Sequence, residues 1–208
     1  MWKSHGRVKQ EDIILKYGAQ VQALLKKAAT LDIKMICPLH GPILKENLAF
    51  YIDKYNTWSS YEPEDEGVFV AYASIHGNTA EAAKEFVEML RKNGAEKVVI
   101  ADLSREDMAE AVEDAFRYSK LVVAAASYDA GVFPCMEDFL HHLKAKNYQK
   151  RTVGIIENGS WAPSAAKQMK AILEGMKNIT ICEPVVTIKS TLNETSRKAM
   201  EELAKELA

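Results

Sequence analysis

The sequence predicts an α/β protein with a doubly wound, five-stranded parallel sheet, helices on both faces, and a mostly helical segment at the N-terminus. Three observations predict this fold class. From residue 67 onward, short apolar runs alternate with stretches of helical periodicity, as in a parallel sheet built from strand–helix–strand units. The apolar runs are continuous, which is typical of strands buried on both faces. A polar, acidic stretch broken by Pro and Gly, residues 59–67, separates this part from the preceding segment.

The strands are predicted from apolar runs that lie between turn-forming residues. The first run is short and continuous, and the third is the most apolar of all. Pro184 lies inside the fifth run and favours an edge position or a bend, because proline cannot donate a hydrogen bond to a neighbouring strand. The five predicted strands are residues 68–73, 97–101, 121–126, 152–156 and 179–188.

A helix is expected after each strand. In the first helix, apolar residues recur at helical spacing between Ala82 and Leu90, and Gly94 supplies the stop. Ser104 and Asp107 have the spacing of a capping box at the start of the second helix. The remaining boundaries follow from the same periodicity: the second to fifth helices are expected over 104–118, from Pro134 past Leu143, over 162–175 and over 193–207.

Composition and charge exclude several classes of function. The net charge of -2 favours neither nucleic acid nor an anionic membrane surface as a partner. A hydrophobic content of 48% is enough for a buried core. The cysteines Cys37, Cys135 and Cys182 are odd in number and lie far apart, without a CxxC motif. This pattern is typical of reduced thiols, so we expect a cytoplasmic protein.

Functional residues are expected at one edge of the predicted sheet. Open parallel sheets bind ligands at the carboxyl ends of their strands, beside the point where the strand order reverses. The loops after the first, third and fourth strands are therefore the candidates. They are residues 74–79 (the first loop), 127–134 (the second loop) and 158–162 (the third loop).

The first loop joins a strand directly to a helix and predicts a phosphate site. Ser74, Asn78 and Thr79 offer side-chain donors, and Gly77 permits a tight turn. The helix that begins here presents unpaired N–H groups and the positive end of its dipole, so a phosphate needs no Lys or Arg. An ordinary helix cap explains Asn78 and Thr79 equally well. Neither a Walker A nor a GxGxxG motif occurs, which favours a mononucleotide phosphate.

The second and third loops carry aromatic side chains that suit a planar ligand. Tyr128 is expected to contact the ligand, whereas Phe133 is expected to pack the second loop onto the sheet. Trp161 is costly to expose unless it stacks on a ligand, and Gly159 lets the backbone approach closely. A tryptophan that only covers the sheet edge is the alternative. The Asp129 carboxylate is expected to point into solvent.

Three motifs together resemble the FMN-binding loops of flavodoxins. They are Ser-x-x-Gly-Asn-Thr at 74–79, Ser-Tyr-x-x-Gly-x-Phe-Pro at 127–134 and Asn-Gly-Ser-Trp-Ala-Pro at 158–163, in the order and spacing of that family. The resemblance implies a flavodoxin-like fold with FMN as cofactor, the first loop on the phosphate and the other two beside the isoalloxazine ring. His76 and the pair Tyr128–Asp129 depart from the common pattern. The residues implied to bind FMN are Ser74, His76, Gly77, Asn78, Thr79, Ser127, Tyr128, Asp129, Gly131, Asn158, Gly159, Ser160 and Trp161.

The N-terminal segment, residues 1–62, does not belong to a flavodoxin domain, which is expected over 67–208. Two amphipathic helices are predicted in the segment. Their apolar faces run from Ile13 to Ala28 and from Leu48 to Trp58. A short strand is predicted between them, at 34–37.

This segment resembles the last part of the metallo-β-lactamase-like diiron domain of flavodiiron proteins. Pro-x-His-Gly-Pro at 38–42 is similar to the element that delivers a final His ligand there, so the resemblance implies that role for His40. No HxExDH motif occurs, and a single His cannot assemble an iron pair, so we predict no metal site in this chain. The resemblance as a whole implies the C-terminal portion of a flavodiiron protein, as a fragment or a truncated gene product.

We therefore predict an FMN-binding electron-transfer module without catalytic residues of its own. In the complete family the flavin passes electrons to a diiron centre that reduces oxygen or nitric oxide, so the resemblance implies an oxidoreductase only in that context. A rubredoxin-like redox protein or a reductase is the expected electron donor, and whether the chain forms a homodimer stays open. The alternative is a stand-alone NAD(P)H-quinone reductase on the same fold. A phosphoacceptor domain and a hydrolase with Cys135 as nucleophile are weaker, because the acidic cluster and the base are missing.

Overall fold

The computed structural model describes residues 16–39 and 41–208 of the chain. It divides into two compact units, Met1–Glu64 and Asp65–Ala208. His40 and the first part of the predicted N-terminal helix, with Ile13, lie outside the described residues.

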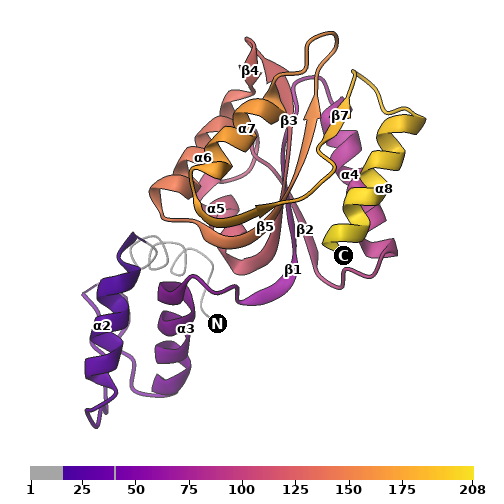
Figure 1. Cartoon of the computed structure of the whole chain (residues 1–208). Helices are drawn as coiled ribbons and strands as arrows, with labels where there is room; N and C mark the ends of the chain where they lie inside the picture. Colours follow the sequence, from indigo (N-terminus) through magenta and orange to yellow (C-terminus); the bar gives the residue numbers. More distant parts are fainter. Residues whose placement is uncertain (1–15, 40) are drawn as a thin grey trace. The chain divides into compact units, whose positions relative to one another are not determined.

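The second unit is built on a mainly parallel sheet whose central strands have the order β2-β1-β3-β5-β6 (Figure 1). All neighbours along this path run parallel. The short β4 pairs antiparallel with the end of β3, and β7 pairs parallel with the end of β5. The strands are β1 Asp65–Ala73, β2 Val98–Asp102, β3 Tyr118–Tyr128, β4 Gly131–Val132, β5 Gln149–Asn158, β6 Lys177–Ile181 and β7 Val186–Ile188.

Helices cover both faces of this sheet. Figure 1 shows α4 and α8 on one face and α5, α6 and α7 on the other. Strand order and helix placement confirm the predicted doubly wound, flavodoxin-like fold. The helices are α4 Asn78–Lys92, α5 Met108–Arg117, α6 Pro134–Ala145, α7 Ala165–Glu174 and α8 Glu194–Leu207.

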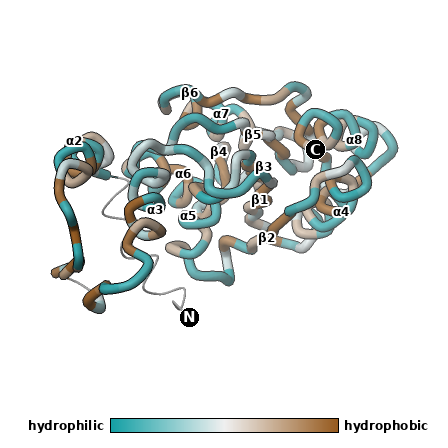
Figure 2. The backbone as a smooth tube through the Cα atoms, turned by 90° about the horizontal axis from the view of Figure 1, so that it is seen from below, coloured by the Kyte–Doolittle hydropathy of each residue, from teal (hydrophilic) through white to brown (hydrophobic). Residues whose placement is uncertain are grey.

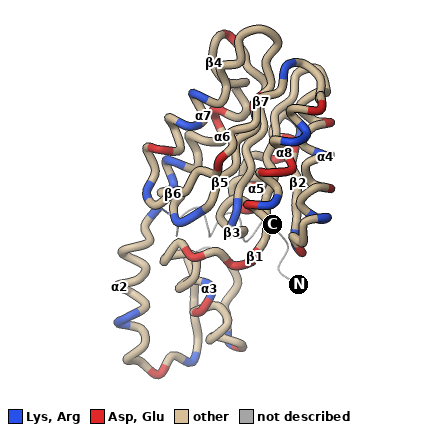
Figure 3. Tube along the Cα trace, turned by 45° about the vertical axis from the view of Figure 1, so that its right-hand side comes forward, with Lys and Arg blue, Asp and Glu red and all other residues tan. Residues whose placement is uncertain are grey.

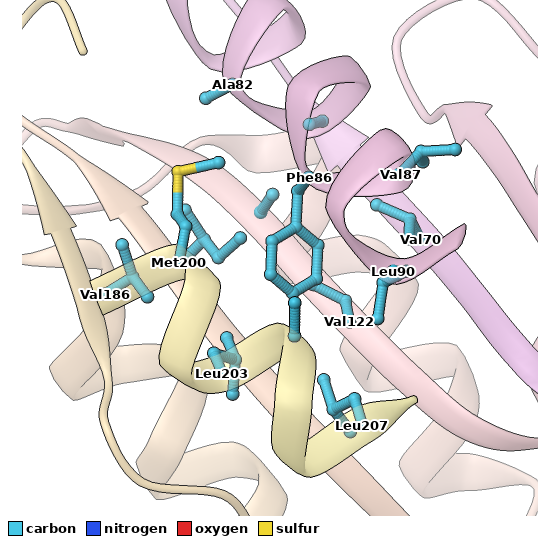
Figure 4. Packing of buried hydrophobic residues seen from close by; sticks show 14 of the residues in the cluster. Val70, Ala82, Phe86, Val87, Leu90, Val122, Val186, Met200, Leu203 and Leu207 are labelled. Carbon is cyan, nitrogen blue, oxygen red and sulfur yellow. The ribbon is translucent and has the colours of Figure 1, made fainter. Parts of the chain in front are cut away.

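One hydrophobic core lies between the sheet and the pair α4 and α8 (Figure 4). In α4 the apolar residues recur every three or four positions, so the helix presents a single stripe that includes Phe86 and Leu90, both 0% exposed. Met200 and Leu203 of α8, on the same face of the sheet, belong to the same core, and Val122 of β3 contributes to it from the sheet. In Figure 2 hydrophobic residues gather on the central strands, whereas hydrophilic residues cover much of α7 and α8.

The predicted fifth strand is broken in two. Residues 179–188 were expected as one strand, but the structure has β6 and β7, which pair with the first and second halves of β5. Pro184 lies between them, after a cis peptide bond. The bend and the edge position expected from Pro184 are both present, because β6 is the last strand of the sheet.

The predicted capping box of α5 is wrong. Ser104 does not cap this helix, because its amide and its hydroxyl both donate to Asp102 Oδ1, at 3.0 and 2.5 Å. Asp107 is the N-cap instead, and its Oδ1 accepts a hydrogen bond from the amide of Ala109 at 2.7 Å. The helix therefore begins at Met108.

In the described part of the first unit, α2 Gly18–Ala28 and α3 Leu48–Ser60 pack against each other. Gly18 permits the close approach, since a Cβ atom there would lie 2.6 Å from the Ser59 carbonyl oxygen. The Gln22 amide donates to the side chains of Asn56 and Ser59, both at 2.9 Å. The strand predicted at 34–37 is reduced to an isolated bridge between Ile36 and Leu44.

Candidate functional site

The three predicted loops lie beside one another at the carboxyl edge of the sheet. They follow β1, β3 and β5, which are adjacent in the strand order.

The first loop ends at Gly77, the N-cap of α4. Its φ of +94° is a left-handed backbone conformation that residues with a side chain rarely adopt. A Cβ atom at this position would meet no other atom, so the backbone conformation, and not a lack of space, accounts for the glycine. Ser74 Oγ accepts a hydrogen bond from the Gly77 amide at 3.1 Å and closes the turn. No side chain caps α4, so the N–H groups of its first turn are available to an anion. His76 is exposed and Asn78 half-buried, whereas Thr79 is buried.

The second loop is a tight β-hairpin. Ser127 pairs with Val132, and Tyr128 pairs with Gly131. The two residues between them, Asp129 and Ala130, have φ values of +45° and +58°, as in a type I′ turn. Asp129 is exposed, as expected.

The aromatic residues of the second loop differ in exposure. The Tyr128 ring contacts the Phe133 ring edge-on, with centroids 5.8 Å apart. Phe133 is half-buried, while 45% of Tyr128 is exposed. Phe133 thus supports the loop, and Tyr128 presents a face to solvent.

The third loop is fixed at its start by the segment after β7. The Asn158 amide group donates to the Ser190 carbonyl at 2.9 Å, and its Oδ1 accepts from the Ser190 amide at 3.0 Å. The Gly159 amide donates to the Ile188 carbonyl at 2.9 Å. A Cβ atom on Gly159 would lie 2.8 Å from Pro163 Cα, so only glycine allows this close packing. The connection runs on to Ser164, because α7 begins at Ala165 and not at the predicted Ala162.

Each loop exposes one large hydrophobic side chain. In the second unit, the exposed side chains of this kind are Ile75 (39%), Tyr128 (45%) and Trp161 (92%), one on each loop. Exposed apolar surface gathered on one edge marks a binding site, and a fully exposed tryptophan is costly without a ligand. The loops contain no Lys or Arg, so an anion must be held by amides and hydroxyls. The residues present fit a ligand with a phosphate at one end and a flat ring at the other.

Several of the thirteen predicted residues already form hydrogen bonds within the protein, and Asn158 and Ser127 each accept or donate two of them. Asn158 is 7% exposed and bonded to Ser190 at both ends of its amide. Ser127 Oγ accepts from the amides of Ser164 and Ala165 at 2.9 and 3.3 Å. Direct contact of these two with the ligand remains a prediction, as it does for the other eleven residues.

The sequence reasoning missed the residues that support the loops. Glu157, 7% exposed, holds the start of α7, and Gln168 reaches back to the second loop. Ser190, with a φ of +65°, holds the third loop. Glu157 directly precedes a predicted ligand residue at a strand end, where a charged residue in an otherwise apolar run is the signal that could have found it.

The surroundings of the loops favour no other chemistry. Among residues 16–39 and 41–208, no group of three or more His, Cys, Asp or Glu could hold a metal ion. Burial raises the pKa of the Cys135 thiol, so the helix start does not activate it. Figure 3 shows acidic and basic residues interspersed along the helices. None of the helices in the described part of the chain is long and apolar enough to cross a membrane.

Comparisons with known proteins agree with this geometry. The family model described as flavodoxin matches residues 70–203. A protein of Methanocaldococcus jannaschii described as uncharacterized is 23% identical over 197 residues, which are 95% of this chain and 50% of that protein. The anaerobic nitric oxide reductase flavorubredoxin of Aliivibrio fischeri is 21% identical over 165 residues, 78% of this chain and 33% of that protein.

Among solved structures, the flavodiiron protein from Giardia intestinalis superposes with a TM-score of 0.88 at 19% identity, over 96% of this chain and 49% of that one. The chain thus spans half or less of the length of these similar proteins. The expected resemblance to the flavodoxin-containing part of flavodiiron proteins is confirmed. Because the family model covers most of the second unit, loops included, the chain belongs to the flavodoxin family, and FMN is the cofactor that this membership implies.

Proposed function

We propose that the second unit holds FMN at the three loops and works as an electron-transfer module. One observation carries the proposal: the exposed large hydrophobic side chains of this unit, Ile75, Tyr128 and Trp161, lie one on each loop, beside an uncapped helix N-terminus. When bound, the isoalloxazine ring of FMN supplies one- and two-electron redox chemistry.

The first loop provides the phosphate end of this site. The open N–H groups of α4 and the positive end of its dipole attract the phosphate, and Gly77 shapes the turn around it. Thr79, buried in the first turn of α4, and Asn78 add side-chain hydrogen-bond donors.

The second and third loops provide the ring end. Tyr128 and Trp161 offer aromatic faces for stacking and exclude water from the ring. In this proposal the backbone of the hairpin at Gly131 and of the turn at Gly159 lines the edge of the ring. The further predicted contacts are Ser74, His76, Ser127, Asp129, Asn158 and Ser160.

We further propose that the chain passes electrons to a diiron centre in a flavodiiron-type assembly that reduces oxygen or nitric oxide. The names of the similar proteins, anaerobic nitric oxide reductase flavorubredoxin and flavodiiron protein, support this role. They also support a rubredoxin-like electron donor. The first unit, residues 1–62 in the proposed division, then corresponds to the end of the diiron domain, and the iron pair itself is held outside this chain. The comparisons favour this role over a stand-alone NAD(P)H-quinone reductase.

Titration of the apoprotein with FMN tests the first proposal. We expect stoichiometric quenching of flavin fluorescence and a yellow protein. Trp161→Ala and Thr79→Ala should weaken FMN binding by about tenfold or more, since each removes one stacking or polar contact worth about 1–3 kcal/mol. Arg105→Ala is the control. The Arg105 side chain is 83% exposed, and the residue lies in the loop after β2, which is not part of the site. A folded protein that does not quench FMN would refute the proposal, and NADH turnover with a quinone would support the reductase.

A further inference from the structure

The first turn of α7 contacts the segments around both loops that are proposed to flank the flavin ring. From β5, Glu157 Oε2 accepts a hydrogen bond from the Ala166 amide at 2.9 Å. The other carboxylate oxygen, Oε1, accepts from Thr187 Oγ1 of β7 at 2.9 Å. The end of β5, where the third loop starts, is therefore tied both to the start of α7 and to β7.

The second loop is tied to the same turn. Ser127 Oγ accepts from the Ser164 and Ala165 amides, and Ser164 Oγ donates to the Gly131 carbonyl at 2.9 Å. Gln168 Oε1 accepts from the Val132 amide at 2.9 Å. The other end of the same amide group, Nε2, donates to Glu137 of α6 at 2.5 Å.

These contacts replace an ordinary helix cap. Ser164 is the N-cap of α7, yet its side chain makes no capping bond to the helix. The amides at the helix start are satisfied by Ser127 and Glu157, two residues at the ends of neighbouring strands. The Glu157 carboxylate also places a negative charge at the positive end of the helix dipole. Because the partners lie on different segments, the helix cannot keep its cap unless those segments hold their positions.

Steric fit makes the connection to the hairpin specific. A Cβ atom on Gly131 would lie 2.4 Å from Gln168 Oε1, so a side chain at position 131 would displace the Gln168 side chain from the Val132 amide. The hairpin backbone and the second turn of α7 are thus in direct contact.

We propose that Glu157, Ser127 and Gln168 are positioning residues that join the second and third loops into one unit through α7. In this unit the loop that carries Tyr128 and the loop that carries Trp161 are held in position by the same helix. The consequence for FMN rests on the proposed function, whereas the coupling between the loops does not. Loosening one loop should loosen the other, even without a cofactor.

Two pairs of variants test the coupling. Glu157→Met keeps the length of the side chain but removes both acceptors, whereas Glu157→Gln retains one acceptor for the Ala166 amide and a donor for the Thr187 hydroxyl. Thr187→Val removes the hydroxyl at constant shape, whereas Thr187→Ser keeps it. Gln168→Met acts from the other end of the connection. Asp107→Ala is the matched control, since it removes the cap of α5 and leaves α7 untouched.

Hydrogen exchange of the apoprotein, followed by mass spectrometry, is the first readout. Glu157→Met should speed exchange in 128–134 by about fivefold or more, although the hydrogen bonds of Glu157 go to Ala166 and Thr187 and not to this segment. Gln168→Met should do the same in 158–164. Glu157→Gln and Thr187→Ser should restore the slow exchange, and Asp107→Ala should change only the start of α5.

FMN affinity is the second readout. Glu157→Met and Gln168→Met should each raise the Kd by about tenfold, and the double variant should be less than additive because one connection is broken twice. Faster exchange confined to the mutated loop, or single effects that add fully, would overturn the proposal. If the parent protein does not bind FMN, the proposed function fails, and the exchange data alone decide whether the loops are coupled.

Discussion

Replacing Tyr148 with phenylalanine should stabilise the protein. Tyr148 is 1% exposed, and its hydroxyl is buried without a hydrogen-bond partner among residues 16–39 and 41–208. Burial also raises the pKa of this phenol. A buried, unsatisfied hydroxyl costs about 1–3 kcal/mol. The ring contributes separately, because it packs edge-on against Phe116 at 5.1 Å between centroids and lies 5.8 Å from the Arg151 guanidinium.

The magnitude follows from what Tyr148→Phe removes and what it keeps. Phenylalanine keeps both ring contacts, and the lost oxygen leaves a cavity of only about 10 Å³, which costs about 0.2 kcal/mol. The net gain in the free energy of unfolding should therefore be about 1 kcal/mol or more. For a domain of this size that corresponds to a rise in Tm of about 2–4 °C. Urea and thermal unfolding of the apoprotein, followed by circular dichroism, measure both quantities.

Tyr72→Phe is the matched control for this experiment. Tyr72 is also buried, at 8% exposure, but its hydroxyl lies close to the Asp102 carboxylate, and burial together with this carboxylate raises the pKa of the phenol. Removal of this hydroxyl should lower the free energy of unfolding by about 0.5–1.5 kcal/mol. Opposite signs for the two variants are the expected result. A loss of stability in Tyr148→Phe as large as that in Tyr72→Phe would refute the reasoning, since it would mean that the Tyr148 hydroxyl has a partner.

Three further predictions concern single positions. Asp65 lies 2.5 Å from Lys97 Nζ and 2.8 Å from Arg117 Nε, and both lower its pKa, so Asp65→Asn should cost about 1 kcal/mol at pH 7. This contribution is present above the unfolded pKa of about 3.9 and is lost as the pH falls through the lower folded value, so urea unfolding should show no difference at the acid end. Burial and the neighbouring Glu206 raise the pKa of the Cys182 thiol to about 12. A disulfide reagent at pH 8 should therefore label the exposed Cys37 and spare Cys182 until the protein unfolds. Labelling of Cys182 in the folded protein would contradict its burial. Gly154→Ala should cost about 1–3 kcal/mol, because the added Cβ would lie 2.8 Å from Leu207 Cδ1 and 3.3 Å from Leu203, and an unchanged Tm would show that α8 moves freely.

The fold could be predicted because its signals are local. The run from Val68 to Ala73 is buried as a whole in the structure, which is what a continuous apolar run indicates in a parallel sheet. The buried face of α4 could be predicted equally well, because helical spacing alone decides which of its residues face the sheet. Errors occurred where two local signals competed. Ser104 and Asp107 both suit a cap, and only the carboxylate of Asp102, which occupies Ser104, decides between them.

The site was predictable in part, for a different reason. The positions of the three loops follow from topology, and the exposure of Tyr128 and Trp161 agrees with the expectation that aromatics there face a ligand. The sequence could not show which polar side chains point outward. Ser127 and Asn158 have the residue types of ligand donors, yet their hydrogen bonds go to segments 32 or more positions away in the chain.

Those long-range bonds explain why support residues escape a reading of the sequence. Glu157 acts on α7 and β7 at once, and nothing in the residues next to it identifies either partner. The reason for the burial of Glu157 lies in the start of α7, which has no side-chain cap of its own and uses the Glu157 carboxylate instead. A buried carboxylate next to a cofactor loop invites a role in chemistry, but here both oxygens are occupied by the protein. Its position therefore favours holding the loops over touching the ligand, and Glu157→Gln, which keeps the bonds and removes the charge, separates these two roles.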